Sequence, residues 1–209
     1  MNLPRLGGAV VALVVGALLL WQLGAFSSAG TAETTNDDGD VVLVEPADVS
    51  IETLAPAGLV VGLREGEVAP DFEFSTFEGE RMRLSDFRGL PVFVNFWASW
   101  CGPCRAELPI MEVKLREHEA DGLVILGVNN GERIQTAQRF LNNLDVKLTA
   151  YAYDPDANVA RRYSIVGMPT SFFIDAQGVI TGVYAIALTE AAMEEAIMQA
   201  IAGHGAPVE

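Results

Sequence analysis

The segment FWASWCGPC, at residues 96–104, is the most informative part of this 209-residue chain. It overlaps the end of a continuous apolar run at residues 91–97, which predicts a central strand buried on both faces. Residues 102 to about 119 are predicted to form a helix, so the cysteines lie where a strand passes into a helix. The two residues between Cys101 and Cys104 let both sulfurs meet at the helix N-terminus, where a disulfide closes with tolerable geometry.

The position of Cys101 before the first helical turn favours a thiolate. Unpaired backbone N–H groups and the positive end of the helix dipole lower the pKa of a thiol there. Cys104, one turn further, is expected to be less exposed and to resolve the mixed disulfide formed with a substrate. A structural disulfide over so short a loop would restrict the unfolded chain little. We therefore predict a redox-active pair.

Metal binding is disfavoured by the composition. The chain has no further cysteine and only two histidines, His118 and His204, at no recognisable zinc spacing. Both histidines are expected to be ordinary surface residues. We predict neither a metal site nor a cofactor.

The overall charge limits the classes of partner. The chain carries 28 acidic and 13 basic residues, a net charge of −15, which disfavours nucleic acid as a partner. Half of the residues are hydrophobic, which excludes a wholly disordered chain.

An uncharged, almost entirely apolar segment occupies residues 6–26. A helix of this length spans about 31 Å, close to the bilayer core thickness of about 30 Å. Arg5 precedes the segment and the next basic residue is Arg64, so residues 1–5 are predicted to be cytoplasmic. We predict a transmembrane signal anchor at residues 6–26. Small residues at 27–32 leave a cleaved signal peptide as the alternative.

Two further zones follow the anchor. Residues 27–57 contain seven acidic side chains and no basic one, and they predict an acidic extracytoplasmic linker in which residues 41–44 could form a short strand. Residues 58–209 are predicted to form one mixed α/β domain. Its further strands are expected at residues 72–77, 81–84, 123–128, 146–152, 170–174 and 179–184. Its further helices are expected at residues 134–143 and 158–163 and from the cap Thr189 to Ala202.

Several motifs of this domain together resemble a known family. They are FWASWCGPC at 96–104, GMPT at 167–170, Pro109 within the helix, GEVAPDF at 66–72, LSDFRG at 84–89 and CRAELP at 104–109. The chain resembles thioredoxin-like proteins, and within them the membrane-anchored TlpA/ResA-like thiol–disulfide oxidoreductases of bacteria, over residues 62–202. The resemblance implies a thioredoxin fold: a mixed central sheet flanked by helices, with an N-terminal β-hairpin and a central helix–strand insert, preceded by one transmembrane helix.

The resemblance also implies roles for individual residues. Cys101 would be the attacking nucleophile and Cys104 the resolving thiol. Pro169 would lie opposite the disulfide in the cis form, and the backbone of Met168 would pair with substrate. Trp100 is expected at the surface, in contact with substrate, and Trp97 in the core.

Glu107 is the candidate acid/base. It lies three residues after Cys104 and should share that helical face, where burial would raise the pKa of its carboxyl toward neutral. In the resembled family a glutamate at this position exchanges a proton with the buried thiol. Thioredoxin has an aspartate where this chain has Asn95, which cannot titrate, so the acid/base role would pass to Glu107.

The predicted function is reduction of disulfides in exported proteins, at the outer face of a bacterial cell membrane. The resemblance implies apocytochrome c before haem attachment as the candidate substrate and a membrane thiol carrier as the electron donor. The Gly102-Pro103 pair matches that of reducing thioredoxins. Two alternatives remain: a peroxiredoxin-like thiol peroxidase, and a Cu(I)-binding metallochaperone using the same cysteines.

Overall fold

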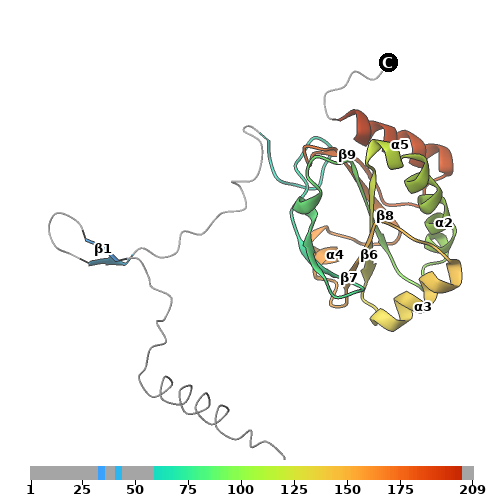
Figure 1. Ribbon diagram of the computed structural model, residues 1–209, viewed down its shortest axis with the longest axis horizontal. Helices are drawn as coiled ribbons and strands as arrows, with labels where there is room; N and C mark the ends of the chain where they lie inside the picture. Colours follow the sequence, from blue (N-terminus) through green and yellow to red (C-terminus); the bar gives the residue numbers. More distant parts are fainter. Residues whose placement is uncertain (1–32, 36–40, 44–58, 204–209) are drawn as a thin grey trace, which may run out of the picture. The chain divides into compact units, whose positions relative to one another are not determined.

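A central trio of parallel strands organises the domain in the computed structural model of the chain, which describes residues 33–35, 41–43 and 59–203. Strand β5 (Val92–Trp97) pairs in parallel with β6 (Val124–Asn130), which pairs in parallel with β7 (Ala150–Asp154) (Figure 1). Every residue of β5 is buried, as its continuous apolar sequence predicts.

Antiparallel strands extend the sheet on both sides, giving seven strands in the order β4-β3-β7-β6-β5-β8-β9. The outer strands form two hairpins: β3 (Glu73–Thr76) with β4 (Arg81–Arg83), and β8 (Thr170–Ile174) with β9 (Ile180–Tyr184). The fold is therefore the predicted thioredoxin-like α/β fold with a mixed sheet, and the N-terminal hairpin is part of it.

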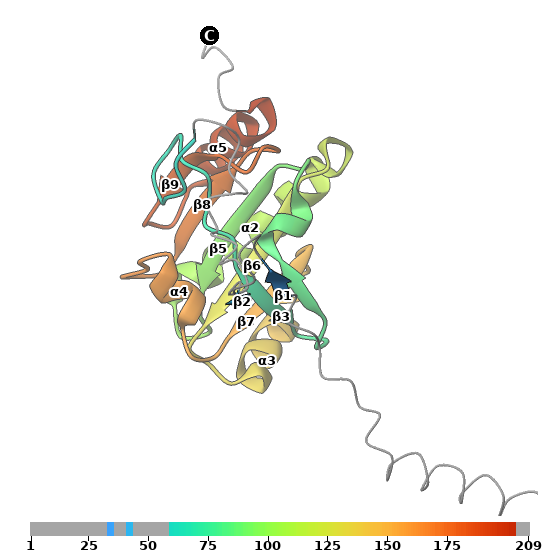
Figure 2. The same ribbon diagram turned by 90° about the vertical axis from the view of Figure 1, so that its left-hand side faces the viewer.

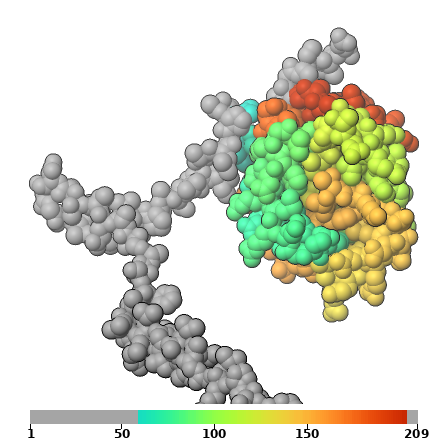
Figure 3. All heavy atoms as spheres, viewed as in Figure 1, coloured from blue at the N-terminus to red at the C-terminus, as the bar shows by residue number. Residues whose placement is uncertain are grey.

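Helices cover both faces of this sheet (Figures 1 and 2). One face packs against α2 (Gly102–Glu117), α3 (Ile134–Leu144) and α5 (Glu190–Ala202). The other face packs against the 3-10 helix η2 (Leu84–Phe87) and α4 (Asn158–Arg162), and a second 3-10 helix, η3 (Glu119–Asp121), follows α2. In the space-filling view of Figure 3 the coloured residues 59–203 form one closely packed body.

Side-chain alternation along β5 separates the two cores. Phe93 and Trp97 join the core beneath α2, whereas Val92, Val94 and Phe96 join the opposite core. Because successive side chains of a strand point to opposite faces, Asn95 lies on the α2 face, together with Phe93 and Trp97. This register places a polar side chain beneath the helix that begins at the cysteines.

The strand predicted at residues 146–152 begins later than expected. Strand β7 starts at Ala150, whereas Val146 and Leu148 are buried in the loop before it. The hydroxyl of Tyr151 donates to the Val146 carbonyl and accepts from the Leu148 N–H, so a side chain satisfies the backbone there. The apolar alternation of this segment therefore reflects burial in a loop, not pairing in the sheet.

The chain divides into two units, residues 1–50 and 51–209. In the first unit β1 (Glu33–Thr35) pairs antiparallel with β2 (Val41–Leu43), which agrees with the short strand expected at residues 41–44. Among the residues that the structure describes, no helix is long and apolar enough to cross a membrane. The anchor predicted at residues 6–26 lies outside the described residues.

Candidate active site

The two cysteines form a disulfide at the start of α2. Cys101 is the N-cap residue, and its sulfur accepts a hydrogen bond from the Cys104 backbone N–H at 3.2 Å. Cys101 is 3% exposed and Cys104 is fully buried, which confirms the expected order of exposure. The Cys101 sulfur therefore lies at the helix N-terminus, where the helix dipole and the free N–H groups stabilise a thiolate.

One turn further along α2, Glu107 is buried at 2% exposure. Its carboxylate accepts two hydrogen bonds, from the Asn95 side-chain amide at 3.3 Å and from the Leu188 backbone N–H at 3.0 Å. Burial raises the pKa of the Glu107 carboxyl, and the hydrogen bonds from Leu188 and Asn95 offset part of that increase. A carboxyl in this environment can take up and return a proton, as general acid/base chemistry requires.

The loop before β8 contains the predicted cis bond. The peptide bond between Met168 and Pro169 is cis. Pro169 is buried, and the half-buried side chain of Met168 packs against the core cluster that includes both cysteines. The Met168 sulfur also accepts a weak hydrogen bond from the side-chain amide of Asn130 at 3.9 Å. The structure thus brings Met168 to the core that contains the disulfide.

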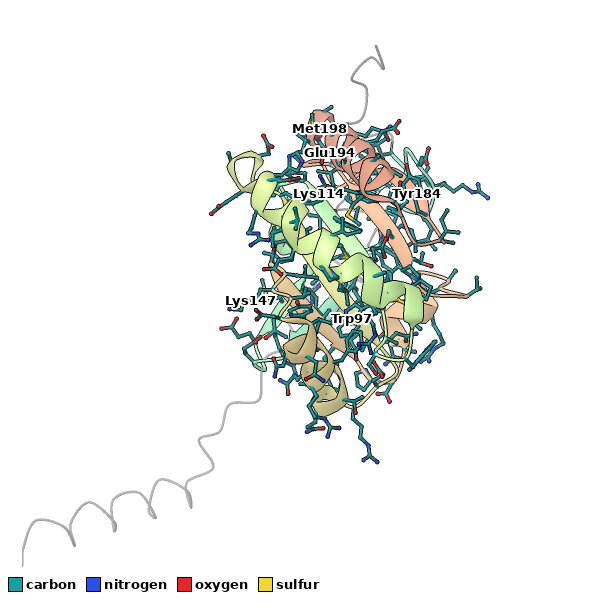
Figure 4. The ribbon with its side chains drawn as sticks, turned by 90° about the vertical axis from the view of Figure 1, so that its right-hand side faces the viewer. Trp97, Lys114, Lys147, Tyr184, Glu194 and Met198 are labelled. Atoms are coloured by element: carbon teal, nitrogen blue, oxygen red, sulfur yellow. A yellow bond between two sulfur atoms is a disulfide. The ribbon has the colours of Figure 1, made fainter. Side chains whose placement is uncertain are left out.

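Exposed apolar side chains flank this region. Trp100 is 69% exposed whereas Trp97 is fully buried, as predicted for both. Trp97 stacks on Phe140 of α3, and Figure 4 shows it among the side chains of this face. Val166, two residues before Met168, is 97% exposed. Trp100, directly before Cys101, therefore presents apolar surface beside the disulfide to an incoming molecule.

Known proteins share this arrangement. The sequence profile of the AhpC/TSA family matches residues 66–183, which is more than half of the chain and includes Cys101, Cys104, Glu107 and Pro169. The chain belongs to the AhpC/TSA family. Within that family it is similar to the thioredoxin-like protein YneN of Bacillus subtilis, with 37% identity over 138 residues, 65% of this chain and 79% of YneN.

Two further relatives specify the branch of the family. The thiol–disulfide oxidoreductase ResA of Bacillus subtilis is 32% identical over 133 residues, 64% of this chain and 74% of ResA. A solved structure from Chlorobium tepidum, assigned as the thiol:disulfide interchange protein DsbE, matches with a TM-score of 0.63 and 34% identity, over 67% of this chain and 99% of that one. This AhpC/TSA protein is a thiol–disulfide oxidoreductase of the ResA/DsbE type.

A second, half-buried carboxylate holds the loop that carries Trp100. Glu132, just after β6, accepts hydrogen bonds from the backbone N–H of Ser99 at 2.7 Å, from the Ser99 hydroxyl and from the side chain of Asn129 at 2.9 Å. The sequence did not single out Glu132. Its only local signal was a polar run, Asn129 to Glu132, that begins at the end of a buried strand.

The expectation for His118 was wrong. His118 is buried, and its two ring nitrogens lie 2.9 Å from an Asp121 oxygen and 3.1 Å from a Glu194 oxygen. Burial lowers the pKa of His118, but the hydrogen bonds to these two carboxylates outweigh burial and raise it. Next to it Lys114 of α2 pairs with Glu194 of α5 at 3.0 Å, and Figure 4 labels both side chains. His118 thus belongs to a polar contact between the end of α2 and α5, and His204 lies outside the described residues.

A metal site needs several ligands close together. Within the described ranges, no group of three or more His, Cys, Asp or Glu side chains has an arrangement that could hold a metal ion.

Proposed function

We propose that this oxidoreductase reduces disulfides in exported proteins, at the outer face of the bacterial cell membrane. The observation that supports this most directly is the disulfide at the N-terminus of α2 with the buried carboxyl of Glu107 one turn away. The family relatives named as thiol–disulfide oxidoreductases support the same chemistry.

The proposed cycle uses three side chains. The Cys101 thiolate attacks one sulfur of a substrate disulfide, and the other substrate sulfur leaves as a thiolate. Cys104 then transfers its proton to Glu107 and attacks the Cys101 sulfur, which releases the second substrate thiolate and forms the Cys101–Cys104 disulfide. Two electrons pass to the substrate. When a membrane thiol carrier reduces the disulfide again, Glu107 returns the proton to Cys104.

The substrate is a polypeptide in this proposal. The exposed apolar side chains of Trp100 and Val166 favour a partner with apolar residues beside its cysteines. The backbone of Met168, beside the cis proline, would pair with the substrate chain. The candidate is the oxidised C-x-x-C-H segment of apocytochrome c before haem attachment, because the ResA-like branch suggests this role.

Membrane anchoring belongs to the same proposal. The uncharged apolar segment at residues 6–26 supports a single-pass anchor, and the acidic linker at residues 27–57 would keep the domain away from the bilayer. Export is consistent with a disulfide enzyme, since disulfides persist outside the cytoplasm.

The reduced full chain, purified in detergent, should reduce an oxidised C-x-x-C-H peptide faster than a peptide of the same composition with its cysteines far apart. Equal rates would argue against apocytochrome c, and no reaction with either peptide would refute the reductase. Hydrogen peroxide and Cu(I) serve as comparison reagents for the two alternatives. Faster oxidation by peroxide than by peptide would favour the peroxidase, and tight stoichiometric Cu(I) binding would favour the metallochaperone.

A further inference from the structure

Residues 98–100 connect β5 to α2 and lead directly into Cys101. The Cys101 backbone N–H donates to the Ala98 carbonyl at 3.1 Å, so the chain makes a tight turn here. Ala98 is buried and Ser99 is half-buried, whereas Trp100 is exposed. The path of this turn therefore determines where α2 begins and where the Cys101 sulfur lies.

A carboxylate from another segment holds this turn through both of its oxygens. Oε2 of Glu132 accepts hydrogen bonds from the Ser99 backbone N–H at 2.7 Å and from the Asn129 side-chain amide at 2.9 Å. Oε1 accepts from the Ser99 hydroxyl. Hydrogen bonds that a carboxylate accepts are stronger than those between neutral groups, so this contact can hold a loop. We call the contact between Glu132 and Ser99 the turn clamp.

The backbone after β6 brings Glu132 to the turn. Asn129 lies opposite Trp97 in the parallel register of β5 and β6. Gly131 has a φ of 69°, a left-handed conformation that favours glycine, and its N–H donates to the Asp154 carbonyl at 2.9 Å. The chain therefore turns immediately after the strand, and Glu132 lies beside the end of β5, where the connection to α2 begins.

We infer that Glu132 is a positioning residue for the nucleophile: the turn clamp fixes residues 98–100 and so keeps the Cys101 sulfur at the N-terminus of α2. This inference rests on the proposed role of Cys101 as the attacking thiol. In the disulfide the Cys101 sulfur accepts from the Cys104 N–H at 3.2 Å, and the helix dipole also favours a thiolate at this position. Both effects require the sulfur to stay at the first helical turn, so loss of the turn clamp should weaken them.

A purely electrostatic role for Glu132 would have the opposite consequence. A nearby carboxylate disfavours a thiolate, so removing its charge alone would lower the pKa of the Cys101 thiol. Positioning predicts that loss of the hydrogen bonds raises this pKa. The two roles can therefore be separated by variants that remove the charge and the hydrogen bonds independently.

Three substitutions make this separation. Glu132→Ala removes both the charge and the turn clamp, whereas Ser99→Ala removes one hydrogen bond and keeps the charge. Glu132→Gln removes the charge only. Its amide oxygen, in place of Oε2, can accept both N–H groups, and its NH2 group, in place of Oε1, can donate to the Ser99 hydroxyl. Glutamine should therefore restore most of what alanine loses.

A second contact of the same chemistry provides the matched control. The two carboxylate oxygens of Asp71 accept from the backbone N–H and from the hydroxyl of Ser85, each at 2.9 Å, and both residues are half-buried. Ser85 belongs to η2, which packs on the face of the sheet opposite α2. Ser85→Ala therefore removes the same kind of hydrogen bond as Ser99→Ala, on the other side of the sheet from the cysteines.

The experiment measures the rate at which iodoacetamide alkylates the reduced full chain, in detergent, from pH 5 to pH 9. The thiolate and not the thiol is the nucleophile, so the midpoint of the profile gives the pKa of the reacting cysteine. Glu107 is present in every variant, so differences between the profiles report the turn clamp.

Ser99→Ala and Glu132→Ala should move the midpoint to higher pH. On the acidic side of the midpoint they should lower the rate about two- to tenfold, the equivalent of one hydrogen bond. Glu132→Gln should lie much closer to the wild type than Glu132→Ala does, and Ser85→Ala should superimpose on the wild type. If Glu132→Ala does not fold, the pair Ser99→Ala and Ser85→Ala, each lacking one hydroxyl, decides the question.

Mass spectrometry of the alkylated chain separates the inference from the proposal on which it rests. Alkylation of Cys104 before Cys101 in the wild type would refute the assignment of Cys101 as the attacking thiol, whatever the variants show. If Cys101 reacts first, three results overturn the inference alone. They are a Ser99→Ala profile that superimposes on the wild type, a Glu132→Gln profile displaced as far as that of Glu132→Ala, and an equal displacement in Ser85→Ala.

Discussion

Replacing Glu107 with glutamine should make the stability of the protein less dependent on pH while slowing its reaction. Glu107 has a pKa above its ordinary value of 4.5 in the folded state, because burial outweighs its two hydrogen bonds. A carboxyl of this kind is neutral in the folded protein at low pH. As pH rises from about 4.5 the unfolded chain ionises first, so the free energy of unfolding falls until the folded carboxyl has ionised too. The glutamine variant does not undergo this loss.

The size of the effect follows from the contacts of the carboxylate. Burying an ion costs several kcal/mol, and each hydrogen bond to a charged group returns about 1.5–3 kcal/mol. With two such hydrogen bonds, from Asn95 and Leu188, a net cost on the order of 1–2 kcal/mol remains. The glutamine NH2 group cannot accept from Asn95 or Leu188, and this cost is the same at every pH. The change in the free energy of unfolding caused by Glu107→Gln should therefore be more favourable at pH 8 than at pH 4.5 by about that amount.

Urea denaturation of the oxidised full chain at both pH values measures this difference. The control is Glu119→Gln, which removes an exposed carboxyl just after α2. Its effect on the free energy of unfolding should show no comparable difference between the two pH values. A Glu107→Gln variant whose difference in stability from the wild type is the same at both pH values would contradict a raised pKa for Glu107.

Three other substitutions test separate parts of the account. Cys104→Ser blocks resolution, so a mixed disulfide between Cys101 and a substrate peptide should accumulate and be visible by mass spectrometry; turnover at the wild-type rate would contradict the assignment. Trp100→Ala should lower kcat/KM about tenfold for a protein disulfide and leave that for a small aliphatic disulfide unchanged, and an equal loss for both would exclude a docking role. His118→Gln should cost ~1 kcal/mol of stability at pH 5.5, where the imidazolium pairs with two carboxylates, and less at pH 8.5, because this stabilisation is lost as pH rises through the raised pKa of His118. Urea denaturation at both pH values checks this, and a deficit that grows with pH would contradict it.

The sequence predicted the elements that local pattern determines. The redox pair could be located from two local patterns. A strand buried on both faces, such as β5, is a continuous apolar run, and a redox pair at a helix N-terminus has two residues between its cysteines. The motif around Pro169 predicted the cis bond through family resemblance. The position of Glu107 on the face of Cys104 followed from helical spacing.

Contacts between distant segments could not be predicted in the same way. Glu132 is 33 residues from Ser99, and their contact depends on β6 lying beside β5 in one register. His118 is buried because Glu194, also 76 residues away, approaches it from α5. In both cases a polar residue that looks ordinary in the sequence acquires its role from the order of strands and the packing of helices.

The reduction potential of the Cys101–Cys104 pair distinguishes a reductase from an oxidant. The full chain in detergent would be equilibrated in thiol–disulfide buffers of defined potential, and the fraction of oxidised protein measured by thiol alkylation. We expect a value of about −270 mV, the thioredoxin end of the scale, as a reductase supplied with electrons through the membrane requires. A value near about −120 mV, the DsbA end, would make the protein an oxidant of exported proteins and contradict the proposed direction of electron flow.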